Sequence, residues 1–380
     1  MAECFIIDAV RTPIGRRNGA LANYRPDELA GETLKALVER AGINPGEVED
    51  VIMGCVTQTG EQGYNIGRLA VLIAGFPVEV PAVSLNRMCG SSQQAIHFAS
   101  QAIRSGDMEM VIAAGVESMT RVPMGSDGAP FSPKLTARFP MVWQGESAEL
   151  IAEKYQIARE ELDLFSLKSH QKAIKAWEQG DFSDEVFPLE VVDGDGNKKI
   201  FNQDEGPRRD TSLEKLSQLK PAFRENGKIT AGNSSQISDG SAAVLLASEG
   251  KAKALGLKPR ARIVATAVVG SDPTLMLDGV IPATQKVLKK AGLTLEDIDI
   301  FEINEAFASV VLAWQKTLGI PEEKINLNGG AIAIGHPLGA SGARIMTTLV
   351  NLLEKHRKKY GLMTMCIGHG MATATVIERV

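Results

Sequence analysis

Residues 35–53, KALVERAGINPGEVEDVIM, and residues 286–302, KVLKKAGLTLEDIDIFE, share one plan. Each contains a helical segment that ends in Ala-Gly, then an acidic turn, and then an apolar strand. A second pair of segments repeats in the same way: residues 81–103 and residues 325–350 each run from an extended stretch through a Gly/Ser elbow into an apolar helix. We therefore expect the chain to fold as two halves of similar plan.

Strands alternate with helices inside each half. In the first half, apolar strands at 51–54, 83–86 and 110–118 are separated by helical segments at 68–74 and 91–104. The last of these strands, MVIAAGVES, is apolar almost throughout, as is typical of a strand that is buried on both faces of a parallel sheet. This alternation predicts an α/β fold built from βαβ units.

The segment between the halves has a different sequence pattern. It combines a turn-rich stretch at 123–140, two expected amphipathic helices within 149–180, and a hairpin turn in VVDGDGNKK at 191–199. The expected division is a first half at 1–118, completed by about 239–259, an inserted loop domain at 119–238, and a second half at 260–380. The insert either covers a substrate, as long excursions from a rigid scaffold often do, or serves packing or oligomerisation.

Composition limits the possible classes of protein. A chain of 380 residues exceeds what one hydrophobic core usually sustains, and its 44% apolar and 23% charged residues are ordinary for an α/β protein. The net charge of −5, with no basic cluster longer than KHRKK at 355–359, argues against a nucleic-acid partner. No export signal, membrane-spanning apolar window or peroxisomal address is visible, so a cytoplasmic location is expected.

The four cysteines are expected to be reduced in that compartment, and none forms a Cys-x-x-Cys pair, so no metal site is expected. Cys89 lies between a strand and a helix that starts with small residues, where the helix N-terminus would stabilise a thiolate. The alternative for Cys89 is a small core residue. Cys366 follows a strand and precedes glycines whose backbone N–H groups could contribute to an oxyanion hole.

His336 is the one histidine in the glycine-rich stretch 326–344, NLNGGAIAIGHPLGASGAR. The glycines allow a close approach of the backbone, and Pro337 disfavours a helical conformation of the residue before it. We expect a loop that holds the imidazole in place for chemistry. The alternative is a capped core histidine in a tight turn.

Four short blocks occur in a fixed order: NRMCGSS at 86–92, NEAFAS at 304–309, GHPLGASGAR at 335–344 and CIGHG at 366–370. They resemble the four active-site blocks of the thiolase superfamily, and the likeness extends over almost the whole chain. The resemblance implies a duplicated five-layer αβαβα architecture, in which two five-stranded halves stack back to back with helices between their sheets. It also implies a loop domain over a coenzyme A site, with coenzyme A and acyl-CoA as substrates and no cofactor.

Carried over residue by residue, the resemblance implies that Cys89 attacks the keto carbon of a 3-oxoacyl-CoA, with His336 as its base. Cys366 would move a proton to or from acetyl-CoA. Asn304 would hold a water that forms one oxyanion site with His336, and the N–H groups of Cys89 and Gly368 would form the other. Taken alone, Asn304 could also be a helix N-cap before EAFASVVLAW.

Residues 208–223 and 231–240 also resemble family segments that contact coenzyme A. The candidate contacts are Ser235 and either Arg208 or Arg209, because a guanidinium group suits phosphate. Either arginine could equally be a surface residue.

Two positions differ from many short-chain biosynthetic thiolases. His369 stands where they have a third glycine, and Trp143-Gln144 stands where they have a His-Met pair. Because these positions surround the acyl pocket in the family, they favour a degradative 3-ketoacyl-CoA thiolase over a biosynthetic acetoacetyl-CoA thiolase. His369 could otherwise be a surface residue or a residue behind the site.

Two rival functions remain for comparison. A decarboxylating condensing enzyme of the same superfamily lacks the second catalytic cysteine, which CIGHG supplies here. A silent lipid-carrier homologue would be expected to have lost Cys89, His336 or Cys366. We expect an enzyme that forms a homodimer or homotetramer and has no membrane partner.

Overall fold

The computed structural model describes residues 3–194 and 196–380. Its strands are β1 (Cys4–Arg11), β2 (Gly15–Arg16), β3 (Asp50–Gly54), β4 (Ala82–Leu85), β5 (Met110–Ser118), β6 (Leu189–Val192), β7 (Lys198–Phe201), β8 (Ser238–Ser248), β9 (Ala261–Gly270), β10 (Ile300–Ile303), β11 (Tyr360–Ile367) and β12 (Met371–Arg379). Its α-helices are α1 (Pro26–Ala41), α2 (Ile66–Ile73), α3 (Ser91–Ser105), α4 (Pro133–Thr136), α5 (Gln144–Lys154), α6 (Arg159–Glu178), α7 (Leu213–Ser217), α8 (Glu249–Ala254), α9 (Val280–Ala291), α10 (Ala308–Leu318), α11 (Ala331–Ile334) and α12 (Ser341–Lys355).

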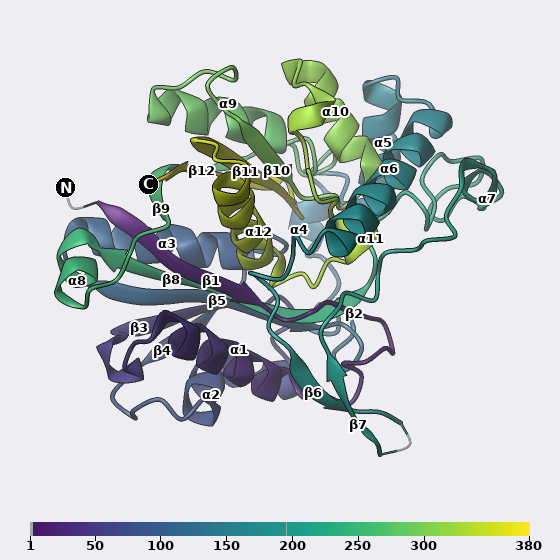
Figure 1. Ribbon diagram of the computed structural model, residues 1–380. Coiled ribbons are helices and arrows are strands. Elements are labelled where there is room, and N and C mark those ends of the chain that lie inside the picture. Colours follow the sequence, from purple (N-terminus) through teal and green to yellow (C-terminus); the bar gives the residue numbers. More distant parts are fainter. Residues whose placement is uncertain (1–2, 195) are drawn as a thin grey trace.

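Helices and strands are arranged in five layers (Figure 1). Helices α1 and α2 cover the outer face of the N-terminal strands, and α9 and α10 cover the outer face of the C-terminal strands. Helices α3 and α12 lie between the two sets of strands and pack against each other. The predicted α/β fold with a layered, duplicated plan is confirmed.

The two halves have matching strand orders. The N-terminal order is β4-β3-β5-β8-β1, in which the first three strands are parallel and β8 is antiparallel to both its neighbours. The C-terminal order is β10-β11-β12-β9, in which β12 takes the place of β8. Two residue pairs between β1 and β9, Phe5↔Arg262 and Ile6↔Ala261, join the halves into one ten-stranded sheet.

The expected extended stretch at the start of residues 325–350 is wrong beyond its first residue. Ile325 forms a single bridge with Phe301, and the chain then turns into the short helix α11. The side chain of Asn326 ends the pairing, because it donates to the carbonyl of Ile303 and accepts from its N–H group. The strand of the C-terminal half that would correspond to β4 is thus reduced to one bridge.

Strand β5 shows why its sequence is apolar almost throughout. Ile112 and Ala114 pack into the core beneath α1 and α2, whereas Val111 and Ala113 pack into the core that surrounds α3 and α12. Both faces of this strand are therefore buried, as predicted from MVIAAGVES.

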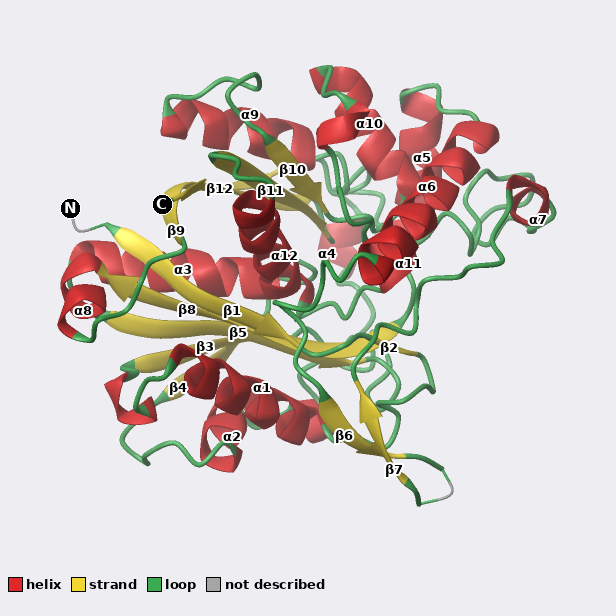
Figure 2. Ribbon diagram, in the orientation of Figure 1, coloured by secondary structure: helices red, strands yellow, loops and turns green. Residues whose placement is uncertain are grey.

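Helices α5 and α6 of the inserted region pack on the C-terminal half, whereas its hairpin of β6 and β7 lies beside α1 of the N-terminal half (Figure 2). The two predicted amphipathic helices are α5 and α6, and the predicted hairpin is β6 paired with β7. Residue 195 in its turn and residues 1–2 at the start of the chain lie outside the described residues. Ala173 and Ala176 of α6 pack with Ala333 and Ile334 of α11, which places the insert beside the loop of His336. Its boundaries at 119 and 238 stay a prediction.

Two features are absent from residues 3–194 and 196–380. No helix there is long and apolar enough to cross a membrane. No group of three or more His, Cys, Asp or Glu side chains there could hold a metal ion.

Candidate active site

Cys89 lies on a strained elbow between β4 and α3. Met88, directly before it, has a φ of 46°, in the left-handed region that side chains rarely adopt. The side chain of Asn86 accepts from the N–H of Met88 at 2.7 Å, and the Ser91 hydroxyl donates to the Met88 carbonyl at 2.6 Å. These bonds hold the cysteine at a fixed place just ahead of the first turn of α3.

The elbow brings Cys89 beside the end of β11. A Cβ on Gly90 would lie 2.4 Å from Cδ1 of Ile367, so any other residue there would force this side chain to move. The backbone N–H of Gly368 points to the Cys89 sulfur, as does the N–H of Cys89 itself, and Cys366 is close enough for the two thiols to interact electrostatically. The structure thus brings together three of the predicted residues.

Burial decides the charge of both thiols. Burial, with a smaller contribution from Glu117, raises the pKa of Cys89 to about 12 against the lowering effect of the two N–H groups. Burial also raises the pKa of Cys366. The N–H groups at the start of α3 favour the thiolate, as the sequence predicts, but desolvation outweighs them, so the thiol needs a base before it can react.

His336 is held on both sides of its ring. Its Nδ1 lies 2.6 Å from Ser341 Oγ, and its Nε2 lies 3.2 Å from Asn304 Nδ2. Gly335, directly before it, has a φ of 117°, and Pro337 follows, so the residue lies outside any helix as predicted. Burial, and next the charge of Arg344, lowers the pKa of His336 to about 3, which leaves the ring neutral at physiological pH.

Asn304 is not a helix cap. Helix α10 begins at Ala308, with Phe307 as its N-cap, so this alternative is wrong. The Asn304 backbone N–H is anchored to the carbonyl of Thr364 on β11, and its side-chain Oδ1 is buried with no protein partner. A water molecule would satisfy this oxygen.

The first turns of α3 and α12 contact each other directly. The N–H of Ala343 donates to Ser92 Oγ at 2.9 Å, and a Cβ on Gly342 would lie 2.2 Å from the Gln93 nitrogen. The partial positive ends of both helices therefore converge on the region of Cys89 and His336. This convergence suits a site in which negative charge develops on sulfur and oxygen.

Glu117 links the two halves behind the site. Its buried carboxylate accepts hydrogen bonds from the N–H of Gly339 in the His336 loop and from the N–H groups of Val56 and Thr57, at 2.8–3.0 Å. Sequence inspection missed Glu117, and it missed Ser341, because the partners of Glu117 are distant in sequence and Ser341 resembles an ordinary first helical residue.

The predicted coenzyme A contacts differ in burial and in their partners. Ser235 is half-buried and donates its N–H to the Ala306 carbonyl, while Gln236, which follows it, accepts from the N–H of His336. Arg208 and Arg209 are exposed, and Arg209 pairs with Glu178. These three contacts stay predictions.

The positions that differ from biosynthetic thiolases lie beside Gly368. A Cβ on Gly368 would lie 3.2 Å from Gln144 Nε2, and the exposed ring of His369 packs edge-on against Phe131, with centroids 5.7 Å apart. His369 adopts a φ of 63°, which a glycine would reach more easily. It therefore lies on the surface, in the turn between β11 and β12, where it contacts the insert through Phe131.

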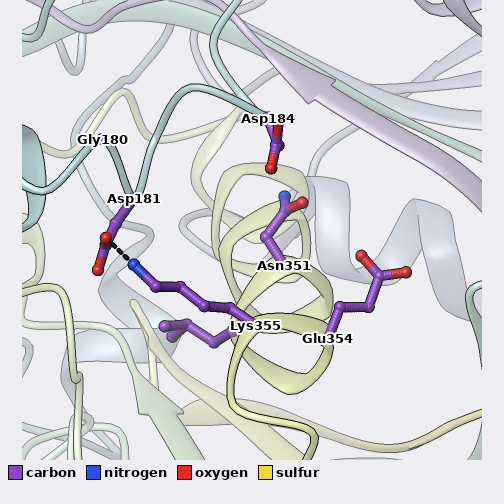
Figure 3. A pocket seen from close by; sticks show the side chains of 7 residues that line it. Gly180, Asp181, Asp184, Asn351, Glu354 and Lys355 are labelled. Atoms are coloured by element: carbon purple, nitrogen blue, oxygen red, sulfur yellow. Dashed lines mark hydrogen bonds and ion pairs between the residues drawn. The ribbon is translucent and has the colours of Figure 1, made fainter.

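A separate pocket lies at the far end of α12 (Figure 3). Lys355 pairs there with Asp181, and Arg260 binds both Asn351 and Glu354. The 15-residue helix α12 separates this pocket from Ser341 by about 20 Å at 1.5 Å per residue. The pocket therefore does not belong to the candidate active site.

Glu302 of β10 supplies a prediction about stability. The side chain is 1% exposed, its Oε1 has no protein partner, and burial raises its pKa to about 8. Between the ordinary value of 4.5 and about 8, the folded state therefore holds the proton that the unfolded state has released, so stability falls as pH rises. Glu302→Gln should remove this slope, which is at most about 1.4 kcal/mol per pH unit.

Urea unfolding of both proteins at pH 5, 6, 7 and 8 measures this effect. The free energy of unfolding of Glu302→Gln should gain on that of the wild type with each step up in pH. Parallel curves would show that Glu302 is already ionised in the folded protein.

Comparison with known proteins decides the family. The description "Thiolase, N-terminal domain" matches residues 4–250, and "Thiolase, C-terminal domain" matches residues 257–379. The chain belongs to the thiolase family. Curated relatives named 3-ketoacyl-CoA thiolase, from Salmonella typhimurium and Aeromonas hydrophila, are each 49% identical to this thiolase over 388 aligned positions that cover 100% of both chains.

Solved structures agree with this assignment. The acetyl-CoA acetyltransferase of Bacillus anthracis superposes on this thiolase with a TM-score of 0.93 at 41% identity, and human mitochondrial 3-ketoacyl-CoA thiolase with a TM-score of 0.93 at 38% identity. Each comparison covers 100% of this chain and 99% of the other.

Proposed function

We propose that this thiolase cleaves 3-oxoacyl-CoA with coenzyme A, giving acetyl-CoA and an acyl-CoA shortened by two carbons, a reaction of fatty acid metabolism. One observation carries the proposal: Cys89 lies beside Cys366 and the N–H of Gly368, while the paired His336 and Asn304 lie on the adjoining loops. The full-length relatives named 3-ketoacyl-CoA thiolase support it.

The first half-reaction transfers the acyl group to Cys89. Neutral His336 accepts the thiol proton at Nε2, and the sulfur attacks the keto carbon of the substrate. The thiolate and imidazolium formed in this step attract each other, which offsets part of the cost of separating charge in a buried site. The bond between C2 and C3 then breaks, leaving an acyl-enzyme and the enolate of acetyl-CoA.

Cys366 supplies the proton that the enolate needs. Because burial keeps its pKa raised, the thiol is protonated at neutral pH and can act as an acid. The resulting thiolate next takes the proton of an incoming coenzyme A thiol. Coenzyme A then attacks the acyl-enzyme, and His336 returns its proton to Cys89, so each group ends in its starting state.

Two oxyanion sites fit the two thioester oxygens. The N–H groups of Cys89 and Gly368, which both point to the Cys89 sulfur, would hold the oxygen of the group attached there. A water on the unpartnered Asn304 Oδ1, together with His336, would hold the other. Removing one such donor typically costs about 3 kcal/mol in the barrier.

Degradation is favoured over acetoacetyl-CoA synthesis. Trp143-Gln144 and His369 differ from the biosynthetic pattern. Gln144 lies next to Gly368, and His369 contacts Phe131 of the insert. Ser235 and the exposed Arg208 remain the proposed contacts for coenzyme A, and Arg209 is the less available arginine because Glu178 binds it. A cytoplasmic location stays a prediction.

A homodimer is the smallest assembly that we propose. Along the residues that the structure describes, β4 pairs only with β3, so its outer edge leaves backbone groups free. Val83 on this strand is 46% exposed, and nearby Tyr64 and Val78 are 94% and 68% exposed. Pairing with the same edge of a second copy would cover all of them. Light scattering should give at least twice the mass of one chain.

The enzymatic test is a thiolysis assay. Loss of the 3-oxoacyl-CoA enolate absorbance on adding coenzyme A should be rapid for eight- and sixteen-carbon substrates and slower for the four-carbon substrate. Activity confined to four carbons would favour the biosynthetic alternative. No turnover at any length would favour the silent lipid carrier.

A further inference from the structure

The Ser341 hydroxyl contacts both the ring of His336 and the backbone of Pro337. Ser341 is the first residue of α12 and is fully buried. Its Oγ lies 2.8 Å from the carbonyl oxygen of Pro337 and 2.6 Å from His336 Nδ1. The hydroxyl thus lies between the imidazole and the backbone of the residue that follows it.

The number of protons available in these contacts determines which ring nitrogen of His336 is protonated. A carbonyl oxygen can only accept, so the single hydroxyl proton of Ser341 goes to Pro337. The remaining lone pair on Oγ can only accept, so Nδ1 of His336 must donate. A neutral imidazole that carries its proton on Nδ1 has a bare lone pair on Nε2.

The contact on the other side of the ring agrees. Asn304 Nδ2 is a donor and lies 3.2 Å from His336 Nε2, which must then be an acceptor. This contact agrees with the tautomer but does not impose it, because rotation of the Asn304 amide would place Oδ1 against Nε2 instead, so the Ser341 contact is the one that decides.

We propose that Ser341 is a positioning residue that holds His336 in the tautomer protonated on Nδ1, so that Nε2 carries no proton of its own and can take that of Cys89. The tautomer follows from the contacts alone, whereas its role in activating Cys89 rests on the proposed function. Without the hydroxyl, the Nδ1 proton would lose its acceptor, and the ring could adopt the other tautomer, which presents an N–H where a base is required.

The direct test is ¹⁵N NMR of protein labelled on histidine. The chain has five histidines, and His336→Gln identifies the signals of His336 by their disappearance. The wild type should show a protonated Nδ1 and an unprotonated Nε2, and Ser341→Ala should lose this pattern. A proton on Nε2 in the wild type would overturn the proposal, even if Ser341→Ala failed to fold. An unchanged pattern in a folded Ser341→Ala would also overturn it.

Kinetics give the second readout. The rate of Cys89 acylation should fall roughly 10- to 100-fold in Ser341→Ala, the range typical of groups that orient a metal-binding histidine through its other ring nitrogen. Ser341→Thr, which keeps the hydroxyl, should recover most of the rate. The matched control is Thr347→Val, which removes a buried hydroxyl of α12 that donates only to Ala343, and it should stay within about threefold of wild type.

Failure of this proposal can be told apart from failure of the proposed function. A wild type without thiolysis would contradict the function, while its NMR spectrum would still decide the tautomer. Normal acylation in a folded Ser341→Ala would contradict the role of Ser341 and leave the function standing.

Discussion

Replacing His336 with alanine is expected to abolish both half-reactions. The imidazole is the proposed base for Cys89, whose pKa burial raises to about 12, so the thiol cannot ionise unaided at neutral pH. The same ring contributes to one oxyanion site together with Asn304. The thiolysis rate and the burst of coenzyme A released on acylation should both fall far below a tenth of wild type.

His356→Ala is the matched control, because it removes an exposed imidazole that follows the last turn of α12. It should keep wild-type rates. Retention of more than about a tenth of wild-type thiolysis in His336→Ala, a loss below about 1.4 kcal/mol, would reduce His336 to a structural histidine.

Replacing Cys366 with alanine is expected to separate the two chemical steps. Attack by Cys89 requires a base and an oxyanion site, which this variant keeps, so acyl-CoA should still acylate the enzyme and release coenzyme A. Enolate formation requires a group over the α-carbon of acetyl-CoA, and losing a positioned base typically costs about 10²–10⁴-fold. Exchange of the α-protons of acetyl-CoA with deuterated solvent should therefore be lost.

Cys4→Ala provides a control for the loss of a buried thiol, since Cys4 lies on β1 opposite Ser248. It should exchange normally. Deuterium entering acetyl-CoA at a near wild-type rate in Cys366→Ala would show that another group, such as His336 or His369, is the base.

Much of the fold followed from local patterns in the sequence. The apolar run of β5 predicted a strand buried on both faces. The prediction was correct because the two faces pack into two different cores. The sequence repeat predicted matching halves. The strand order confirms it, since β3 and β10 occupy equivalent places in the two halves. The extended stretch expected at the start of residues 325–350 was wrong beyond Ile325, because the side chain of Asn326 bonds to the backbone of Ile303 in place of a paired strand, a contact that the pattern of apolar residues does not encode.

The candidate site was predictable where a residue type carries the chemistry, as for the two cysteines and His336. It was not predictable where the role depends on tertiary partners. Glu117 joins segments far apart in sequence, and the tautomer of His336 depends on which atom Ser341 faces. The raised pKa of Cys89 was not predictable for a related reason, because its degree of burial is set by the whole fold.

Mass spectrometry after incubation with acyl-CoA tests the central claim most directly. Cys89 is the proposed acyl carrier, because it alone lies on the elbow before α3 with two N–H groups pointing to its sulfur. Proteolysis of the quenched enzyme should yield the acyl adduct on the peptide that contains Cys89, and Cys366 should remain free. An adduct on Cys366 with Cys89 unmodified would contradict the account.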